Sequence, residues 1–236
     1  MLLFVLCIGA SFVLRVVGFG FGIFIMTWLT TLMPSYGEAT ALSGILAMCT
    51  SAWVVFRMRK HLVWSHLWPM LLTFVAVSAF SICCLSRIED RVLNMVLGIV
   101  LILVSLYFLF LNGRIHIRPT RTAQIGAGTL SGLMGGFFAM QGPPAVLYFL
   151  ESERDKDRYM ALIQTYLFTG NIGMTAVRAA NGFVTPAVGW GIVYGIGGVV
   201  IGSLIGTLVY RHISTKVLRT LVYLFLGVSG VLLLCR

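Results

Sequence analysis

The chain has 236 residues, of which 59% are hydrophobic and only 10% are charged, and its mean hydropathy is +0.98. Soluble domains are about 45–50% apolar and about 25% charged, so this composition excludes a soluble enzyme and a disordered chain. The 17 Lys and Arg residues against 7 Asp and Glu are typical of the basic cytoplasmic loops of a helical membrane protein. An all-α integral membrane protein is therefore predicted.

Eight apolar stretches follow one another along the chain, and most are close to the about 20 residues that a membrane crossing needs. They are residues 2–33, 36–56, 67–85, 92–111, 123–150, 159–180, 186–210 and 215–235. The first and the fifth are too long for one crossing, and glycines interrupt both. The residues at these interruptions are Gly18, Gly20 and Gly22 in the first stretch, and Gly142, Pro143 and Pro144 in the fifth. Each of these two stretches is expected to form a broken helix or a re-entrant hairpin.

Clusters of basic residues between the stretches indicate the orientation, because Lys and Arg favour the cytoplasmic side. The clusters are Arg57, Arg59 and Lys60; Arg114, Arg118 and Arg121; Arg154, Lys156 and Arg158; and Arg211, Lys216 and Arg219. Since the clusters before and after residues 123–150 both favour the cytoplasm, that stretch must enter the membrane and return to the same side. Residues 2–33 then form a hairpin that enters from outside, with the N-terminus external.

This topology divides the chain into two inverted repeats, each a hairpin followed by three transmembrane helices. The first repeat, 1–112, contains hairpin 2–33 and helices 36–56, 67–85 and 92–111. A basic cytoplasmic linker, 113–122, leads to the second repeat, 123–236, which contains hairpin 123–150 and helices 159–180, 186–210 and 215–235. Matches at an offset of 120, such as Gly22 with Gly142 and Leu42 with Leu162, agree with a duplication. In transporters of this architecture, the broken segments mark a binding site near the bilayer midplane.

The broken segments can bind an anion through their backbone. A helix that starts within the membrane leaves unpaired N–H groups and a partial positive charge at its first turn. Glycines let this backbone approach a ligand closely, and Pro143 fits the first turn of a helix. Two such helix starts, facing each other, would form an anion site. The alternative is that the glycines only allow close helix packing.

Polar side chains near the second interruption add to this hypothesis. Gln141 directly precedes Gly142, and Asn171 shares a helical face with Gln164, seven positions away. The alternative for each amide is a hydrogen bond between helices. The predicted substrate-binding residues are Arg15, Gly18, Gly20, Gly22, Gln141, Gly142, Pro143 and Asn171.

Charged residues inside the apolar stretches are few, and the two clear cases, Arg15 and Arg178, are both basic. Intramembrane charges are expensive and mark functional sites by default. Arg15 is the expected charge partner of the anion, with an anchor at the membrane interface as the alternative. Arg178 lies near the end of its segment, where an interfacial position is favoured. The carboxylates other than Glu38 lie in connections, so an anion path fits better than a proton-driven cation exporter.

Motifs of enzymes and metal sites are absent from the sequence. The four histidines lie in connections without metal-ligand spacing, the five cysteines form no C-x-x-C pair, and neither Walker A nor G-x-S-x-G occurs. The chain is therefore predicted not to be an enzyme and to need no cofactor or metal.

Two glycine-rich motifs stand at the interruptions. The first is Gly18-Phe19-Gly20-Phe21-Gly22, with Pro34 at the end of its stretch, and the second is Gly132-x-x-Gly135-Gly136-Phe137-Phe138-x-x-x-Gly142-Pro143-Pro144. With the architecture, they resemble the sulfite exporter TauE/SafE family over essentially the whole chain. The resemblance implies a permease for sulfite, sulfonates and related sulfur-containing anions. Phe21 and Gln141 depart from the more glycine-rich family pattern, so Gln141 could itself determine the substrate.

The sequence thus predicts a secondary transporter (a permease or exporter) of a small sulfur-containing oxyanion, such as sulfite or an organosulfonate. Alternating access around a midplane site is the expected mechanism. An anion channel or facilitator and a non-transporting membrane scaffold subunit stay open as alternatives. The expected partners are a small anionic substrate and the lipid bilayer of a bacterial cell (inner) membrane, without nucleic acid. A homo-oligomer and the coupling ion also stay open.

Overall fold

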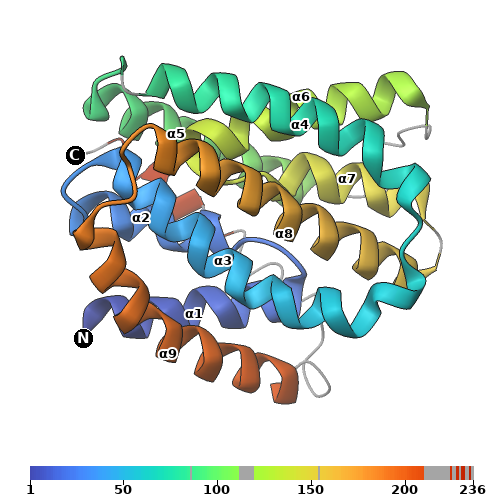
Figure 1. The fold of residues 1–236 in the computed structure, drawn as a ribbon, viewed down its shortest axis with the longest axis horizontal. Helices are drawn as coiled ribbons and strands as arrows, with labels where there is room; N and C mark the ends of the chain where they lie inside the picture. Colours follow the sequence, from blue (N-terminus) through green and yellow to red (C-terminus); the bar gives the residue numbers. More distant parts are fainter. Residues whose placement is uncertain are drawn as a thin grey trace.

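The computed structural model describes residues 1–85, 87–111, 120–153 and 155–209, together with residues 224, 227, 228, 230, 231 and 234. This part of the chain contains helices and no strand (Figure 1). The all-helical prediction is therefore confirmed. Most of the predicted linker 113–122 and most of the predicted helix 215–235 lie outside the described residues.

Nine α-helices make up the described part of the fold. They are α1 (Leu2–Val17), α2 (Phe21–Leu32), α3 (Tyr36–Met58), α4 (Trp64–Leu85), α5 (Asp90–Leu106), α6 (Arg121–Phe138), α7 (Gly142–Ser152), α8 (Lys156–Ala180) and α9 (Pro186–Val209). A 3-10 turn, Arg59–His61, extends α3, and a π-helical turn, Tyr107–Leu111, extends α5. The two long stretches each contain two helices, α1 with α2 and α6 with α7, separated at the glycine-rich interruptions.

Side chains cap the starts of three helices that follow a connection. Ser35 and Glu38 form a capping box at α3: the Glu38 N–H donates to Oγ of Ser35, and the Ser35 N–H donates to Oε2 of Glu38. Thr120 caps α6 and Asp155 caps α8 in the same way, each accepting a backbone N–H. The hydrogen bond from the Arg158 N–H lowers the pKa of the exposed Asp155 carboxyl. The connections therefore stop and restart the helices at defined positions.

Three helical segments in the described part of the chain are long and apolar enough to cross a membrane: Tyr36–His61, α4 and α9. Helix α8 has 25 residues, a length of about 37 Å that also suffices. Its lower hydropathy comes from polar residues that face the protein interior, among them Gln164, Asn171 and Arg178. α1 and α2 are apolar but shorter. α9 exposes large apolar side chains, such as Val193 and Leu208. Such an apolar surface is favourable in contact with lipid.

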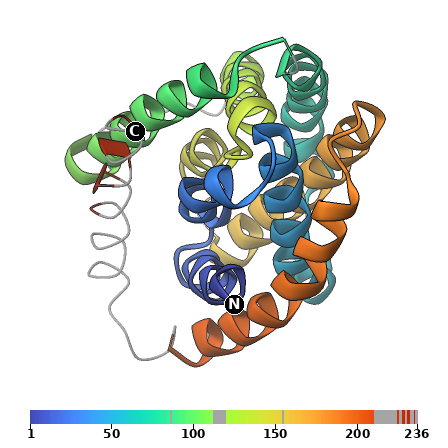
Figure 2. The ribbon, with the colours of Figure 1, turned by 90° about the vertical axis from the view of Figure 1, so that its left-hand side faces the viewer.

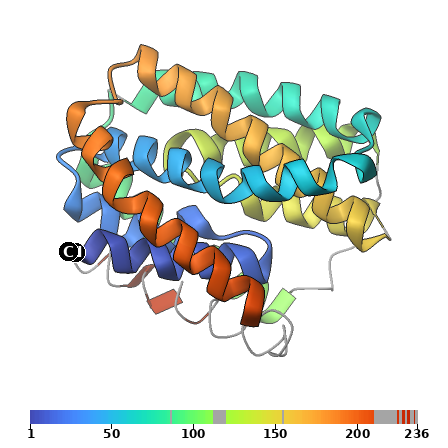
Figure 3. The ribbon, with the colours of Figure 1, turned by 60° about the horizontal axis from the view of Figure 1, so that its bottom comes forward.

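Two pairs of helices pack closely through glycines at their contacts. α1 packs against α9 along one side of the molecule, and α4 packs against α6 along the other (Figures 1 and 3). Gly198 and Gly202 of α9 approach the backbone of α1, and Gly132 and Gly136 approach α4 from α6. α3 and α8 pack against each other between these pairs, and the short helices α2 and α7 lie in the interior (Figure 2). Glycine thus serves helix packing in α6 and α9, as small residues commonly do in membranes.

An alanine at Gly202 is expected to lower stability, because its Cβ would clash with the carbonyl oxygen of Ile8 on α1. Forcing a methyl group into a packed interface costs about 1–3 kcal/mol. Thermal unfolding in detergent should therefore start at a lower temperature for Gly202→Ala. Gly189→Ala on the same helix is the matched control, since a Cβ there meets nothing within 4 Å. Equal melting of the two variants would contradict the close α1–α9 contact.

Two carboxylates, Glu38 and Glu153, are buried in the described part of the chain. The burial of Glu153 does not follow from the sequence, which places this residue in a connection. Glu38 belongs to the capping box of α3, and Glu153 at the end of α7 pairs with Nδ1 of His66 at 2.5 Å. This pair links the end of α7 to the start of α4. Neither carboxylate lines the cavity described below.

Candidate functional site

The first helix break lies between α1 and α2 and depends on glycine. Gly18 ends α1 with φ of 89°, and Gly20 precedes α2 with φ of 105°. Both values fall in the left-handed region, which side chains with a Cβ rarely adopt. The Gly18 N–H donates to the Leu14 carbonyl and closes α1, so the chain turns and starts α2 within the protein interior.

The second break lies between α6 and α7 and has a different composition. Ala139 ends α6 in the left-handed conformation, with φ of 55°, although it is not a glycine. Its N–H donates to the Gly135 carbonyl, and the Met140 N–H donates to the Met134 carbonyl. The hydroxyl of Ser131 donates to the Gln141 carbonyl and holds the break against α6. These hydrogen bonds stabilise the break and so offset the strain of the left-handed conformation at Ala139.

The two breaks face each other. A Cβ on Gly22 would clash with the Ala139 carbonyl oxygen, and a Cβ on Gly142 would lie 3.2 Å from Cβ of Phe19. The start of α2 therefore contacts the second break at a position where only glycine leaves room, and the start of α7 packs closely against the first break. The Gln164 amide on α8 donates to the Gly18 carbonyl at 3.1 Å and ties the first break to the long helix beside it.

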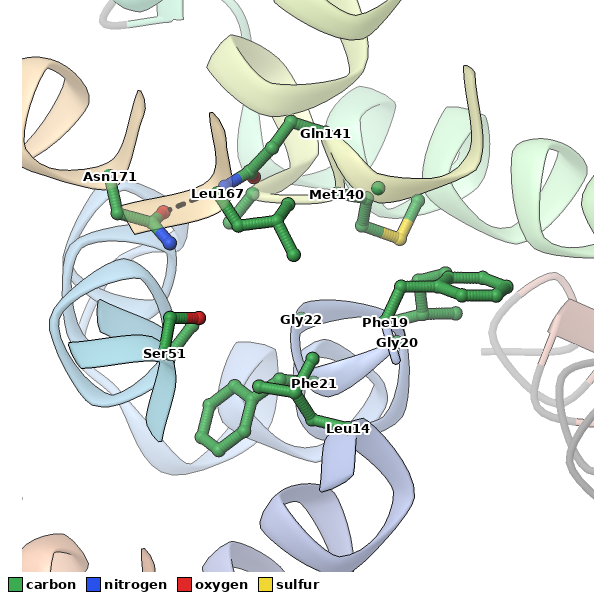
Figure 4. A pocket seen from close by; sticks show the side chains of 14 residues that line it. Leu14, Phe19, Gly20, Phe21, Gly22, Ser51, Met140, Gln141, Leu167 and Asn171 are labelled. Atoms are coloured by element: carbon green, nitrogen blue, oxygen red, sulfur yellow. Dashed lines mark hydrogen bonds between the residues drawn. The ribbon is translucent and has the colours of Figure 1, made fainter. Parts of the chain in front are cut away.

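A cavity of about 30 Å³ lies between the breaks, about twice the accessible volume that one water molecule needs (Figure 4). Its lining residues are Leu14, Phe19, Gly20, Phe21, Gly22, Ile23, Ala47, Ser51, Ala139, Met140, Gln141, Gly142, Leu167 and Asn171. Figure 4 shows the amide of Gln141 joined to that of Asn171, a hydrogen bond from Nε2 to Oδ1 of 3.0 Å. The Ser51 hydroxyl is buried and has no hydrogen-bond partner in the part of the chain that the structure describes.

Backbone donors at the cavity come mainly from the start of α2. The N–H groups of Phe21, Gly22 and Ile23 lie in the first turn of this helix and have no acceptor within it, and all three residues line the cavity. α7 contributes the N–H of Gly142, but its next two residues are Pro143 and Pro144, which have no N–H. The two prolines in the first turn of α7 therefore remove two donors, and the two helix starts are unequal.

The structure brings five of the eight predicted site residues to this cavity: Gly20, Gly22, Gln141, Gly142 and Asn171. Gly18 ends α1 and Pro143 lies in the first turn of α7, and neither residue lines the cavity. Arg15 is not among the lining residues. Its Nε donates to Oγ1 of Thr207 on α9 at 2.9 Å, so the chain holds this guanidinium towards α9 rather than towards the breaks.

Arg178 corrects a further expectation. Its place near the end of an apolar stretch favours an interfacial position, but the side chain is 0% exposed and donates to carbonyl groups of α6. Ser51 is a lining residue that sequence reasoning missed. The available signal was its offset from Asn171: the two residues are 120 positions apart, as are Gly22 and Gly142.

The model of one protein family matches nearly the whole chain. The family model described as "Sulfite exporter TauE/SafE" matches residues 3–233. No curated protein and no solved structure matches the chain significantly. The match agrees with the resemblance that the two glycine motifs carry.

Proposed function

The chain belongs to the sulfite exporter TauE/SafE family and is a membrane permease, and from this premise we propose that it is a secondary transporter of a small sulfur-containing oxyanion. Sulfite is the substrate that the proposal favours. The observation that carries the proposal is the cavity between the two helix breaks, with the first turn of α2 among its lining residues. An organosulfonate is a larger substrate of the same class.

Anion recognition follows from the groups that line the cavity. A helix start offers N–H groups and a partial positive charge, which suits an oxyanion. The Ser51 hydroxyl, unpartnered in the described structure, and the amides of Gln141 and Asn171 add side-chain donors. None of the 14 described lining residues carries a carboxylate that would repel an anion. The small volume favours an ion of the size of sulfite over one with a long organic tail.

The depth of the cavity fits a transport site. Ala47 is the middle residue of α3, which runs from 36 to 58, and Leu167 is one residue from the middle of α8, which runs from 156 to 180. A site at half the length of two long helices is about equally far from both membrane surfaces. That position suits a ligand released alternately to either side.

An inverted repeat is the architecture that we infer for this site. Twelve of the lining residues form pairs at an offset of 120: Phe19 with Ala139, Gly20 with Met140, Phe21 with Gln141, Gly22 with Gly142, Ala47 with Leu167, and Ser51 with Asn171. The helix packing shows the same correspondence when α1 is paired with α6, α3 with α8 and α4 with α9. α1 packs against α9 as α6 packs against α4, and α3 packs against α9 as α8 packs against α4. These correspondences support a two-fold axis through the cavity.

Alternating access is the mechanism that such an axis suggests. With three crossings in each repeat, an odd number, the second repeat would enter the membrane from the opposite side, which agrees with the basic clusters and an external N-terminus. The two hairpins would then face opposite sides of the membrane. Rocking of one repeat against the other would open the cavity first to one side and then to the other.

Counterflow in liposomes tests the proposed function. Vesicles that contain the purified protein and unlabelled sulfite should accumulate labelled sulfite from outside, with saturation, whereas protein-free vesicles should not. Thiosulfate and methanesulfonate should compete, and a carboxylate such as acetate should not. Ionic currents without counterflow would instead indicate a channel. Neither flux nor binding of any anion in this panel would indicate a scaffold subunit.

A further inference from the structure

A buried arginine lies close to Asn171, one of the residues that line the cavity. Arg178, on the last turn of α8, is 0% exposed. Its Nη2 donates to the carbonyl oxygens of Gly135 at 2.9 Å and of Gly136 at 3.2 Å, both in the last turn of α6. A cation at the carbonyl end of a helix interacts favourably with the helix dipole. These two hydrogen bonds satisfy Nη2 of the guanidinium group.

The rest of this guanidinium lies near the buried Tyr36 side chain but lacks hydrogen bonds to the described residues. Nε and Nη1 make no hydrogen bond within the part of the chain that the structure describes. The ion pair found there joins His66 to Glu153, so no described carboxylate neutralises Arg178. Burying an unpaired charge costs several kcal/mol. A membrane protein retains such a charge mainly where it serves function.

Nη1 of Arg178 lies close to Asn171, which is on the same face of α8. A Cβ built on Gly44 of α3 would lie 3.2 Å from Nη1 of Arg178 and 3.5 Å from Oδ1 of Asn171. These two polar groups therefore converge over the same glycine. Asn171 lines the cavity and accepts the hydrogen bond from Gln141. The positive charge is therefore close to Asn171, which belongs to the pair of amides at the cavity.

We propose that Arg178 supplies the positive charge that balances the bound oxyanion, acting on the cavity beside Asn171. This inference rests on the proposed function. Arg15, the other arginine within an apolar stretch, does not have this role: it is half-buried, bonds to Thr207 and does not line the cavity. The position 120 residues before Arg178 is Met58, so the charge occurs in only one of the two paired halves.

Sulfite binding to the purified full-length protein, measured by calorimetry, tests this role. Arg178→Met, which copies Met58, should weaken binding roughly 100-fold or more, because a buried anion loses its charge partner. Arg178→Lys keeps the charge and should stay within about tenfold of the wild type. Arg15→Gln is the matched control and should stay within about twofold. Wild-type affinity in Arg178→Met, or a large loss in Arg15→Gln, would overturn the inference.

A second readout separates charge from structural support. Sulfite is a monoanion on the acidic side of its second ionisation and a dianion on the alkaline side. Removing one positive charge costs the dianion about twice as much Coulomb energy. Arg178→Met should therefore lose more affinity for the dianion than for the monoanion. An equal loss for both would mean that Arg178 only supports α6, and would overturn the inference.

Salt dependence provides a third readout. Buried charges are screened little, so the loss of sulfite affinity at raised ionic strength should be the same in the wild type and in Arg178→Met. A clearly smaller salt dependence in Arg178→Met would place the charge on the surface and contradict the role of Arg178. If the wild type neither binds nor transports sulfite, the proposed function fails, and the inference fails with it. Normal wild-type binding with an unchanged Arg178→Met variant removes the inference alone.

Discussion

Replacing Gly22 by alanine is expected to reduce sulfite uptake to the level of empty liposomes. The added Cβ would collide with the Ala139 carbonyl oxygen, which is backbone and cannot turn away as a flexible side chain could. The start of α2 and the second break would have to separate, and the cavity between them would lose its shape. The strain of about 1–3 kcal/mol is small enough for the protein to fold.

The matched control for this variant is Gly126→Ala on α6, where a Cβ meets nothing within 4 Å. Uptake by proteoliposomes with equal amounts of inserted protein should be normal for Gly126→Ala and absent for Gly22→Ala. Thermal unfolding of both variants shows how much of the effect is stability. Normal uptake by Gly22→Ala would mean that the contact between the breaks is not needed for transport.

Replacing Gln141 by alanine should lower sulfite uptake roughly 10- to 100-fold without lowering expression. The substitution removes an amide donor from the cavity and leaves Oδ1 of Asn171 without its partner, a loss worth about 1–3 kcal/mol. Since the two side chains form one unit, the Gln141→Ala/Asn171→Ala double variant should lose less than the sum of the single losses.

Gln124→Ala provides the control for a lost buried amide. Gln124, on α6, is also buried, but its Nε2 donates to the His66 carbonyl, and neither residue lines the cavity. Uptake by this variant should stay near the wild-type rate. Unchanged uptake in Gln141→Ala, measured alongside, would remove Gln141 from the substrate site.

The helical elements of this protein could be predicted because apolar stretches and glycine clusters are local signals. The break between α1 and α2 follows from Gly18 and Gly20, whose positive φ angles only glycine adopts easily. The break after α6 was visible from Gly142 and Pro143, although the residue with positive φ is Ala139. Helix starts such as Tyr36 and Pro186 coincide with the predicted stretches.

The functional environment of the arginines could not be predicted, because it depends on contacts between distant segments. The position of Arg178 near the end of its helix favours the membrane interface. Its side chain is instead buried, because Gly44 leaves room for the guanidinium and the carbonyls of α6 accept its hydrogen bonds. Arg15 was the expected charge partner of the anion, and the structure places its Nε on Thr207, 192 positions away. No periodicity or charge count in the sequence reveals either contact.

We propose that the two helix breaks together form one oxyanion site. Diffraction from crystals grown with selenite, an analogue of sulfite whose selenium scatters anomalously, tests this proposal most directly. One selenium peak is expected in the cavity between Gly22 and Gly142, with the selenite oxygens within hydrogen-bonding distance of the first-turn N–H groups of α2. A peak at Arg15 and Thr207, or none in the cavity at selenite concentrations that compete with sulfite transport, would contradict it.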